Sequence, residues 1–161
     1  MTDEAPPPRM RPFFPTVQDF AAASAPHFQF LVSEFGFVGP SIEEQNDEMY
    51  DVAYYGPSTA VLLNWDTTGS FFACNLAPRL GDGTLDPDYE HWLSANEVVA
   101  ARGGADRWVS QAELDDVDLA GYASVMEREA ANLRDFCGDV LRGDWSVRAD
   151  AQRWLEQAPP S

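Results

Sequence analysis

The sequence predicts a single α+β domain, in which an antiparallel meander of three or four strands packs with an N-terminal helix and C-terminal helices. The chain has 161 residues, the usual size of one domain with its own core. Short apolar runs separated by glycine-containing breaks occupy residues 52–76, which is typical of strands joined by hairpins. After residue 94 the apolar residues instead recur three and four positions apart, which is typical of helices.

The first 15 residues contain five prolines, which remove backbone donors and favour an extended, solvated chain. We therefore expect a disordered proline-rich tail over residues 1–15, a domain over 16–157 and a disordered C-terminal end over 158–161. Phe13 and Phe14 are placed to attach the end of the tail to the domain.

The first helix is predicted over residues 24–35. Ser24 is the expected N-cap, and Pro26 lies in the first turn, where a missing N–H costs no hydrogen bond. Apolar residues follow at helical spacing until Gly36 ends the segment. A short amphipathic helix is the expected element.

Strands are predicted in the middle of the chain at residues 51–55, 60–65 and 71–76. Gly56-Pro57 separates the first two, and a polar turn at 66–69 separates the second from the third. Connections this short join antiparallel neighbours, so a meander follows. A further strand at 37–42 is weakened by Gly39-Pro40.

Two capping boxes open the C-terminal half, at Ser94-Ala95-Asn96-Glu97 and Ser110-Gln111-Ala112-Glu113. The helix after the first box is expected to end at Gly103-Gly104. The longest predicted helix follows the second box, and its apolar stripe comprises Leu119, Tyr122, Met126, Ala130, Leu133, Cys137 and Val140. A last short helix is expected over residues 147–155.

Charge is the most unusual feature of the composition. Acidic residues number 27 against 10 basic ones, all arginine, for a formal net charge of -17. A field of this sign repels nucleic acid and anionic membranes and speeds encounter with basic partners. A basic protein partner is therefore expected, with no nucleic acid and no membrane. The alternative is that acidity serves solubility or reflects the composition of the source proteome.

The N-terminal residues carry early acids and prolines in place of a basic stretch followed by an apolar one, so no secretory signal is recognised. No apolar run approaches membrane-spanning length, and a cytoplasmic location is expected. Cys74 and Cys137 lie far apart, each in an apolar pattern, and are predicted to be buried thiols.

Catalytic motifs are not recognised in the sequence. His27 and His91 are the two histidines, and no serine stands in a glycine-flanked nucleophile elbow. One loop gathers metal-ligating residue types, namely Asp86, Asp88, Glu90 and His91. Its spacing does not fit the calcium loop, because Pro87 interrupts it and the required glycine is missing. The expectation is a protein that is not an enzyme and carries no cofactor.

Aromatic residues occupy both faces of the predicted strands, which leaves surplus apolar area if one face is open to water. One interpretation is that helices cover both faces. The other is a surface that binds a protein partner, with Tyr55 or Trp65 as the anchor. Its charged rim would comprise Glu43, Glu44, Asp47, Glu48 and Asp66.

Four features of the sequence together resemble a family of small bacterial proteins. They are Glu34-Phe35-Gly36-Phe37 at a helix end, the strand pair Tyr-x-Gly-Pro-x-x-x-Val-x-Leu with its Asp turn, Ser-Ala-Asn-Glu-Val-Val, and Leu-Arg-Gly-Asp-Trp after the long helix. Some of these proteins resemble immunity proteins of polymorphic toxin systems. The resemblance covers roughly residues 25–155 and implies a binding role without catalytic residues.

Three functional hypotheses follow. The first is a cytoplasmic protein-interaction module, of the immunity-inhibitor type, that covers a basic site on its partner with an acidic, aromatic surface. The second is a small enzyme or a metal- or ligand-binding domain that uses the loop from Asp86 to His91. The third is a structural subunit that pairs through the helix over residues 119–140. The oligomeric state stays open.

Overall fold

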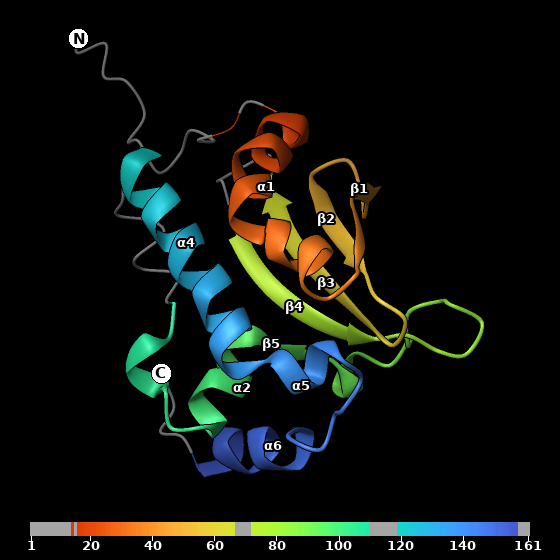
Figure 1. Ribbon diagram of the computed structural model, residues 1–161, viewed down its shortest axis with the longest axis vertical. Coiled ribbons are helices and arrows are strands. Elements are labelled where there is room, and N and C mark those ends of the chain that lie inside the picture. Colours follow the sequence, from red (N-terminus) through yellow and green to blue (C-terminus); the bar gives the residue numbers. More distant parts are fainter. Residues whose placement is uncertain (1–13, 15, 67–71, 110–118, 158–161) are drawn as a thin grey trace, which may run out of the picture.

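An antiparallel sheet lies at the centre of the molecule, with helices packed against it (Figure 1). The computed structural model describes residues 14, 16–66, 72–109 and 119–157. In these residues the sheet has five strands, which neighbour one another in chain order. They are β1 (Val38–Glu44), β2 (Met49–Tyr55), β3 (Thr59–Asp66), β4 (Phe72–Pro78) and β5 (Leu93–Ser94).

Along the chain, helices both precede and follow the long strands of the sheet. One precedes it, α1 (Val17–Ser33), and the others follow its long strands. Those that follow are α2 (Ala95–Ala101), α4 (Leu119–Phe136), α5 (Gly138–Leu141) and α6 (Arg148–Gln157), with short 3₁₀ turns η2 (Tyr89–His91) and η3 (Ala105–Arg107).

This architecture confirms the predicted α+β class, while the sheet has five strands in place of the expected three or four. The additional strand, β5, is two residues long and pairs with β4 through Asn75 with Ser94 and Leu76 with Leu93. Two residues are too few to show an alternating pattern in the sequence. Ser94 belongs both to this pairing and to the N-cap of α2.

The strand at Gly39-Pro40 forms through a bulge. The β1–β2 register shifts between Val38 and Ser41. Gly39 lies there at φ 152°, and a Cβ on it would come within 2.7 Å of the carbonyl oxygen of Ala53. Pro40, which lacks an N–H, is tolerated because β1 is an edge strand.

Helix α1 begins at Val17, earlier than the predicted start at Ser24. Thr16 caps it in a reciprocal capping box with Asp19. Ser24 is buried within the helix, where its hydroxyl donates to the carbonyl of Ala21 at 3.2 Å. The prediction was wrong because Thr16 and Asp19 already form the capping box earlier in the chain, which places Pro26 inside the helix and not in its first turn.

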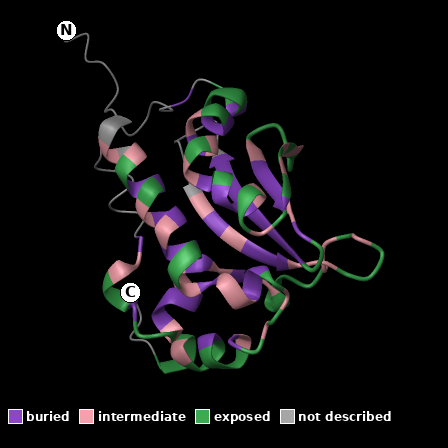
Figure 2. Cartoon of the chain, in the orientation of Figure 1, coloured by how far each residue is buried: buried purple, intermediate pink, exposed green. Residues whose placement is uncertain are grey.

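The inner face of the sheet holds the main core. Side chains from alternate positions of the three central strands pack with α1 and α4, and the buried residues follow these facing surfaces (Figure 2). Phe14 joins this core at 6% exposure, with its ring 5.5 Å from that of Phe20. The strand members of the core are Val52, Tyr54, Val61, Leu63, Trp65, Cys74 and Leu76.

The outer face carries a second, smaller cluster. Small and aliphatic side chains form its floor, and they are Ala53, Ala60, Leu62 and Ala77. Tyr55, Leu85 and Trp92 pack on this floor. The expectation that helices cover both faces is therefore wrong for the described residues, because side chains from β2 and the 79–92 segment cover the outer floor.

The predicted C-terminal stripe is buried from Met126 through Val140, although a break at Cys137 divides the expected long helix into α4 and α5. Gly138 follows the break, where glycine weakens helix continuation. The cap of α2 is also as predicted, since the hydroxyl of Ser94 accepts from the amide of Glu97 at 3.1 Å. The final helix lies at the predicted place.

Several predictions concern segments outside the described residues. These are the turn at 67–69, the capping box at 110–113, most of the tail over 1–15 and the end at 158–161. Where the structure describes a helix, it is never long and apolar enough to cross a membrane.

Both cysteines are buried free thiols, as predicted, and they lie near a buried carboxylic acid. Glu129 of α4 is 3% exposed, and desolvation raises its pKa to about 7 against a smaller opposing effect of Arg128. Burial raises the pKa of Cys137 to about 12 and that of Cys74 well above its ordinary value, and the charge of Glu129 adds to both shifts. A protonated Glu129 therefore suits this part of the core.

We expect Glu129→Gln to stabilise the protein at pH 8 and to have little effect at pH 5. The pKa of Glu129 rises from 4.5 to about 7 on folding, so its contribution to stability is complete below pH 4.5 and is lost as the pH rises through 7. The gain in the free energy of unfolding should grow by roughly 2 to 3 kcal/mol between the two pH values. Urea unfolding measures this, with exposed Glu127→Gln as the control. An equal gain at both pH values would contradict a raised pKa.

Candidate functional site

The predicted acidic residues gather at one end of the sheet. Glu43 and Glu44 end β1, and Asp47 and Glu48 lie in the turn before β2. Glu43 is half-buried and the other three are exposed. The backbone of Asp66, at the end of β3, pairs with the first residue of β2 beside the same turn. We refer to Glu43, Glu44, Asp47 and Glu48 as the acidic hairpin.

The acidic hairpin has no cationic partner among the described residues. The ion pairs of the described residues involve carboxylates outside the hairpin, namely Glu34, Asp86, Asp88, Asp135, Asp139 and Asp150. The described arginines that form pairs reach toward the helices and loops, away from the β1–β2 turn. The hairpin therefore adds a local negative potential to an already acidic chain.

A row of polar residues extends from the hairpin across the outer face. Glu43, Asp51 and Asn64 are direct Cα partners on β1, β2 and β3. The amide of Asn64 donates to Asp51 Oδ1 at 3.2 Å, and that of Gln45 donates to Asp51 Oδ2 at 2.6 Å. Burial raises the pKa of Asp51; these two bonds oppose the rise, and the charge of Glu43 adds to it. We refer to Glu43, Asp51 and Asn64 as the outer row.

One acceptor in the outer row is left without a hydrogen bond. Asn64 is 6% exposed, and its amide nitrogen is already directed at Asp51. Its Oδ1 atom is buried and has no hydrogen-bond partner. An unmade bond of this kind costs about 1 to 3 kcal/mol, so the row has unused capacity to accept a donor.

Tyr55 reaches the row from the other end of β2. Its hydroxyl donates to Glu43 Oε1 at 3.1 Å, an oxygen that also accepts from Ser41 at 3.0 Å. Arg79 lies over the other side of the ring, 5.2 Å from its centroid. Desolvation first, and then the nearby Glu43, raise the pKa of Tyr55 to about 12. Tyr55 is thus half-buried and fixed in place rather than freely exposed.

Trp65 does not lie on this surface, and its predicted role as an exposed anchor is wrong. It is 2% exposed and belongs to the inner core, where its ring lies 5.9 Å from that of Tyr50. The reason is the strand alternation: Trp65 shares the face of Val61 and Leu63, which pack against the helices. Asn64, its neighbour in sequence, points to the outer face instead.

Sequence reasoning missed Asp51, Asn64 and Gln45 as members of this surface. A signal for Asp51 was present, since a single acid stands between Tyr50 and Val52 in an apolar strand. Its alternation with Ala53 and Tyr55 places it on the face opposite the core. The link to Asn64 depends on the strand register, which the sequence pattern alone leaves unspecified.

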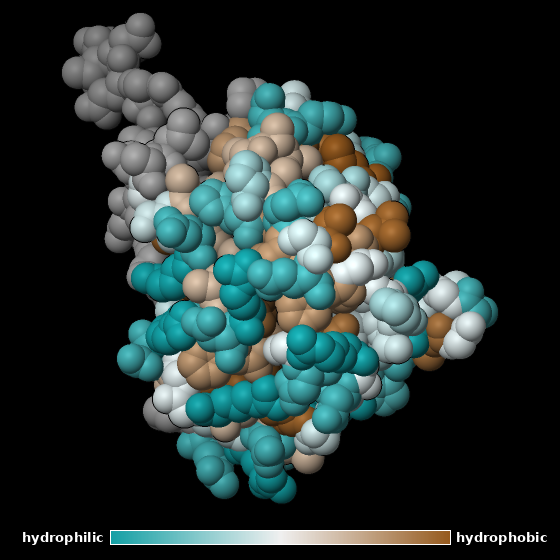
Figure 3. Space-filling view, viewed as in Figure 1, coloured by the Kyte–Doolittle hydropathy of each residue, from teal (hydrophilic) through white to brown (hydrophobic). Residues whose placement is uncertain are grey.

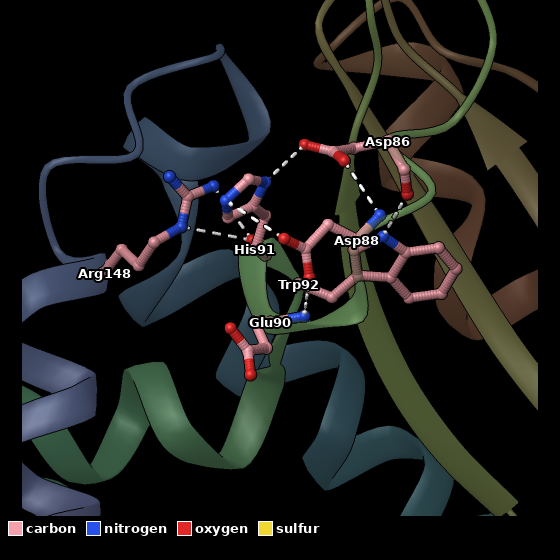
Figure 4. A network of polar contacts seen from close by, with 6 residues as sticks. All are labelled: Asp86, Asp88, Glu90, His91, Trp92 and Arg148. Atoms are coloured by element: carbon pink, nitrogen blue, oxygen red, sulfur yellow. Dashed lines mark hydrogen bonds and ion pairs between the residues drawn. The ribbon is translucent and has the colours of Figure 1, made fainter.

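The loop that contains the second set of predicted residues is drawn in Figure 4. Asp86 Oδ2 lies 2.7 Å from His91 Nδ1, and Asp88 Oδ2 lies 3.6 Å from His91 Nε2. Both carboxylates also organise the backbone, because Asp86 accepts from the amide of Asp88 and Asp88 accepts from the amide of Glu90. The bond from the Asp88 amide, and then the bond with His91, lower the pKa of Asp86.

Further contacts anchor the loop on both sides. The indole of Trp92 donates to the carbonyl of Asp86 at 2.8 Å, and Arg148 of α6 donates to the carbonyl of His91 at 2.8 Å. Glu90 points away from the imidazole (Figure 4). The described residues contain no group of three or more His, Cys, Asp or Glu side chains arranged to hold a metal ion. Each polar contact that joins Asp86, Asp88 and His91 shapes the loop itself.

We expect Asp51→Ala to lower the free energy of unfolding by about 1 to 3 kcal/mol at pH 7. The change removes both carboxylate oxygens, so the amides of Asn64 and Gln45 lose their acceptor. Urea unfolding measures the loss. Glu44→Gln, an exposed member of the acidic hairpin, serves as the control and should stay within about 0.5 kcal/mol. Equal effects of the two changes would contradict the bonding assigned to the outer row.

Comparisons with models of known protein families, with curated proteins and with solved structures found no match for this chain. The geometry of the acidic hairpin, the outer row and the 86–91 loop is accordingly the basis for a functional assignment.

Proposed function

We propose that this protein is an interaction module that binds a basic protein partner through the acidic hairpin and the outer row. The observation that carries this proposal is the set of exposed carboxylates at one end of the sheet without cationic partners in the described residues. The net charge of -17 extends the same field over the whole molecule. Such a field speeds the encounter with a basic surface and disfavours acidic competitors.

The composition of the surface supports a protein as the partner. The face of the molecule that α1 and α4 cross is mostly hydrophilic, with smaller hydrophobic patches (Figure 3). On β1 the exposed aliphatic residues are Val38, at 74%, and Ile42, at 38%. Val38 pairs with Tyr55 and adds apolar contact area to the outer face, whereas Ile42 pairs with Val52 and lies on the face toward the helices.

The mode of action that fits this surface is inhibition of the immunity type. The protein would cover a basic site on its partner, and its own side chains would need no catalytic role. Attraction between opposite charges chiefly sets the association rate and its salt dependence. Structural rigidity favours this mode, because the outer row is joined to the sheet by hydrogen bonds through Asp51 and Glu43.

Charge reversal provides the test. We expect the triple variant E44R/D47R/E48R to lose a partner that the natural protein captures from lysate of its source cells at low salt. The matched variant D106R/E127R/E156R also reverses three exposed acids, so each variant changes the formal net charge from -17 by 3 × 2 = 6, to -11. It should retain the partner. Quantitative mass spectrometry of the three captures, at low and high salt, measures the result.

The two variants separate a specific surface from general acidity. Equal loss from both would mean that total charge, and not the hairpin, governs binding. Retention by the hairpin variant would place the interface elsewhere. The expected pattern is at least a ten-fold loss for the hairpin variant, with salt sensitivity confined to the natural protein and the matched variant.

A further inference from the structure

A hollow of about 280 Å³ lies beside the 86–91 loop, apart from the acidic hairpin. Aromatic side chains from η2 and its end, polar side chains from β4 and β5, and a carboxylate from α2 line it. These residues are Asn75, Tyr89, Trp92, Leu93, Ser94 and Glu97. Its volume is slightly below the range of about 300 to 1,000 Å³ for pockets that hold drug-sized ligands. It suits the end of one side chain better.

An aromatic pair stands at this hollow, one ring largely exposed and the other partly buried. Tyr89 is 72% exposed, and its ring contacts that of Trp92 in an edge-on arrangement with centroids 4.7 Å apart. The indole N–H of Trp92 is held by the carbonyl of Asp86, which fixes the orientation of the ring. In Figure 4 this indole lies on the side of the loop toward the sheet, away from the imidazole of His91. The two rings form a preorganised wall.

Glu97 supplies the negative charge. It lies at the third position of α2, next to Ser94, and is half-buried. Burial raises the pKa of its carboxyl, while hydrogen bonding with Ser94 opposes that rise. A cation placed in the hollow would therefore compensate a carboxylate that is partly removed from water. Asn75, the strand partner of Ser94, adds an amide at the same place.

Stacking of a guanidinium on an aromatic ring recurs elsewhere in the molecule. The chain repeatedly places its own arginines over aromatic rings, with guanidinium carbons 4.7 to 5.2 Å from the ring centroids. The rings concerned are those of Tyr55, Phe136, Phe30, Phe35 and Trp145. Tyr89 and Trp92 have no described arginine over them, although they stand beside a carboxylate. The hollow thus combines two aromatic rings with a carboxylate.

We propose that this hollow binds an arginine side chain of a protein partner. The guanidinium would stack against Tyr89 and Trp92 and donate to Glu97 and Asn75. Arginine fits better than lysine because its planar group stacks on rings and its five donors serve acceptors in several directions. The identity of the donor as a basic protein rests on the proposed function, whereas the recognition of guanidinium rests on the hollow alone.

A short peptide tests the recognition without the partner. The probe is acetyl-Gly-Arg-Gly-amide, titrated into the ¹⁵N-labelled full chain while the indole N–H signal of Trp92 and the side-chain amide of Asn75 are followed by NMR. Both signals should shift with saturation. The lysine peptide should bind several-fold more weakly, and the neutral glutamine peptide should cause no comparable shift. Equal shifts with the glutamine peptide would overturn the proposal.

Variants assign the binding to the lining residues. Glu97→Gln should weaken binding of the arginine peptide at least ten-fold. Glutamine is also found at the third position of a capping box, so α2 should still begin at the same residue. Tyr89→Leu, at an exposed position, should weaken binding of the same peptide several-fold. The control is Glu90→Gln, which removes one charge from the same loop. The side chain of Glu90 points away from the indole of Trp92 (Figure 4). Unchanged affinity in Glu97→Gln, or an equal loss in Glu90→Gln, would overturn the proposal.

Capture experiments then separate this inference from the proposed function. If the peptide fails to bind but the partner is still lost on reversal of the acidic hairpin, the hollow is not an arginine site and the proposed function stands. If the peptide binds as described but no partner depends on the hairpin, the hollow recognises arginine and the proposed function fails.

Discussion

The register of β2, β3 and β4 decides which side chains share a face, and the remaining features of the molecule depend on it. Val52 lies opposite Leu63, and Leu63 lies opposite Cys74, so an apolar row faces the helices. The intervening positions place Asp51 beside Asn64 on the other face. A shift of one residue would bury the polar row in the main core. The core and the candidate site are therefore specified together.

The two faces are covered by different means, and this leaves the acidic end of the sheet open. Helices α1 and α4 close the inner face with large side chains. On the outer face the floor is made of alanines and one leucine, so single side chains such as Tyr55 and Trp92 are enough to cover it. The acidic hairpin extends beyond this cover, at the edge of the sheet. Its charges also discourage edge-to-edge pairing of β1 with another chain.

Much of the fold could be predicted because local patterns and tertiary packing agree. The alternation in β2, the Ser94 cap and the stripe from Met126 to Val140 each specify a face or an end without knowledge of the rest. The short strand β5 could not be predicted, since its two pairs depend on the position of β4. The candidate site combines residues of two kinds. Its acids are local in sequence, whereas the burial of Trp65 follows from the strand register and from the helices that cover one face.

Amide hydrogen exchange of the complex would show whether the proposed partner binds the acidic hairpin and the outer face of the sheet. The exchange rates of the free protein and of the protein bound to its captured partner would be compared along the chain. We expect slower exchange in the β1–β2 hairpin and in the segment that carries Tyr89 and Trp92, with little change in α1 and α4. Protection concentrated on the exposed surfaces of α1 and α4, with the hairpin unchanged, would contradict it.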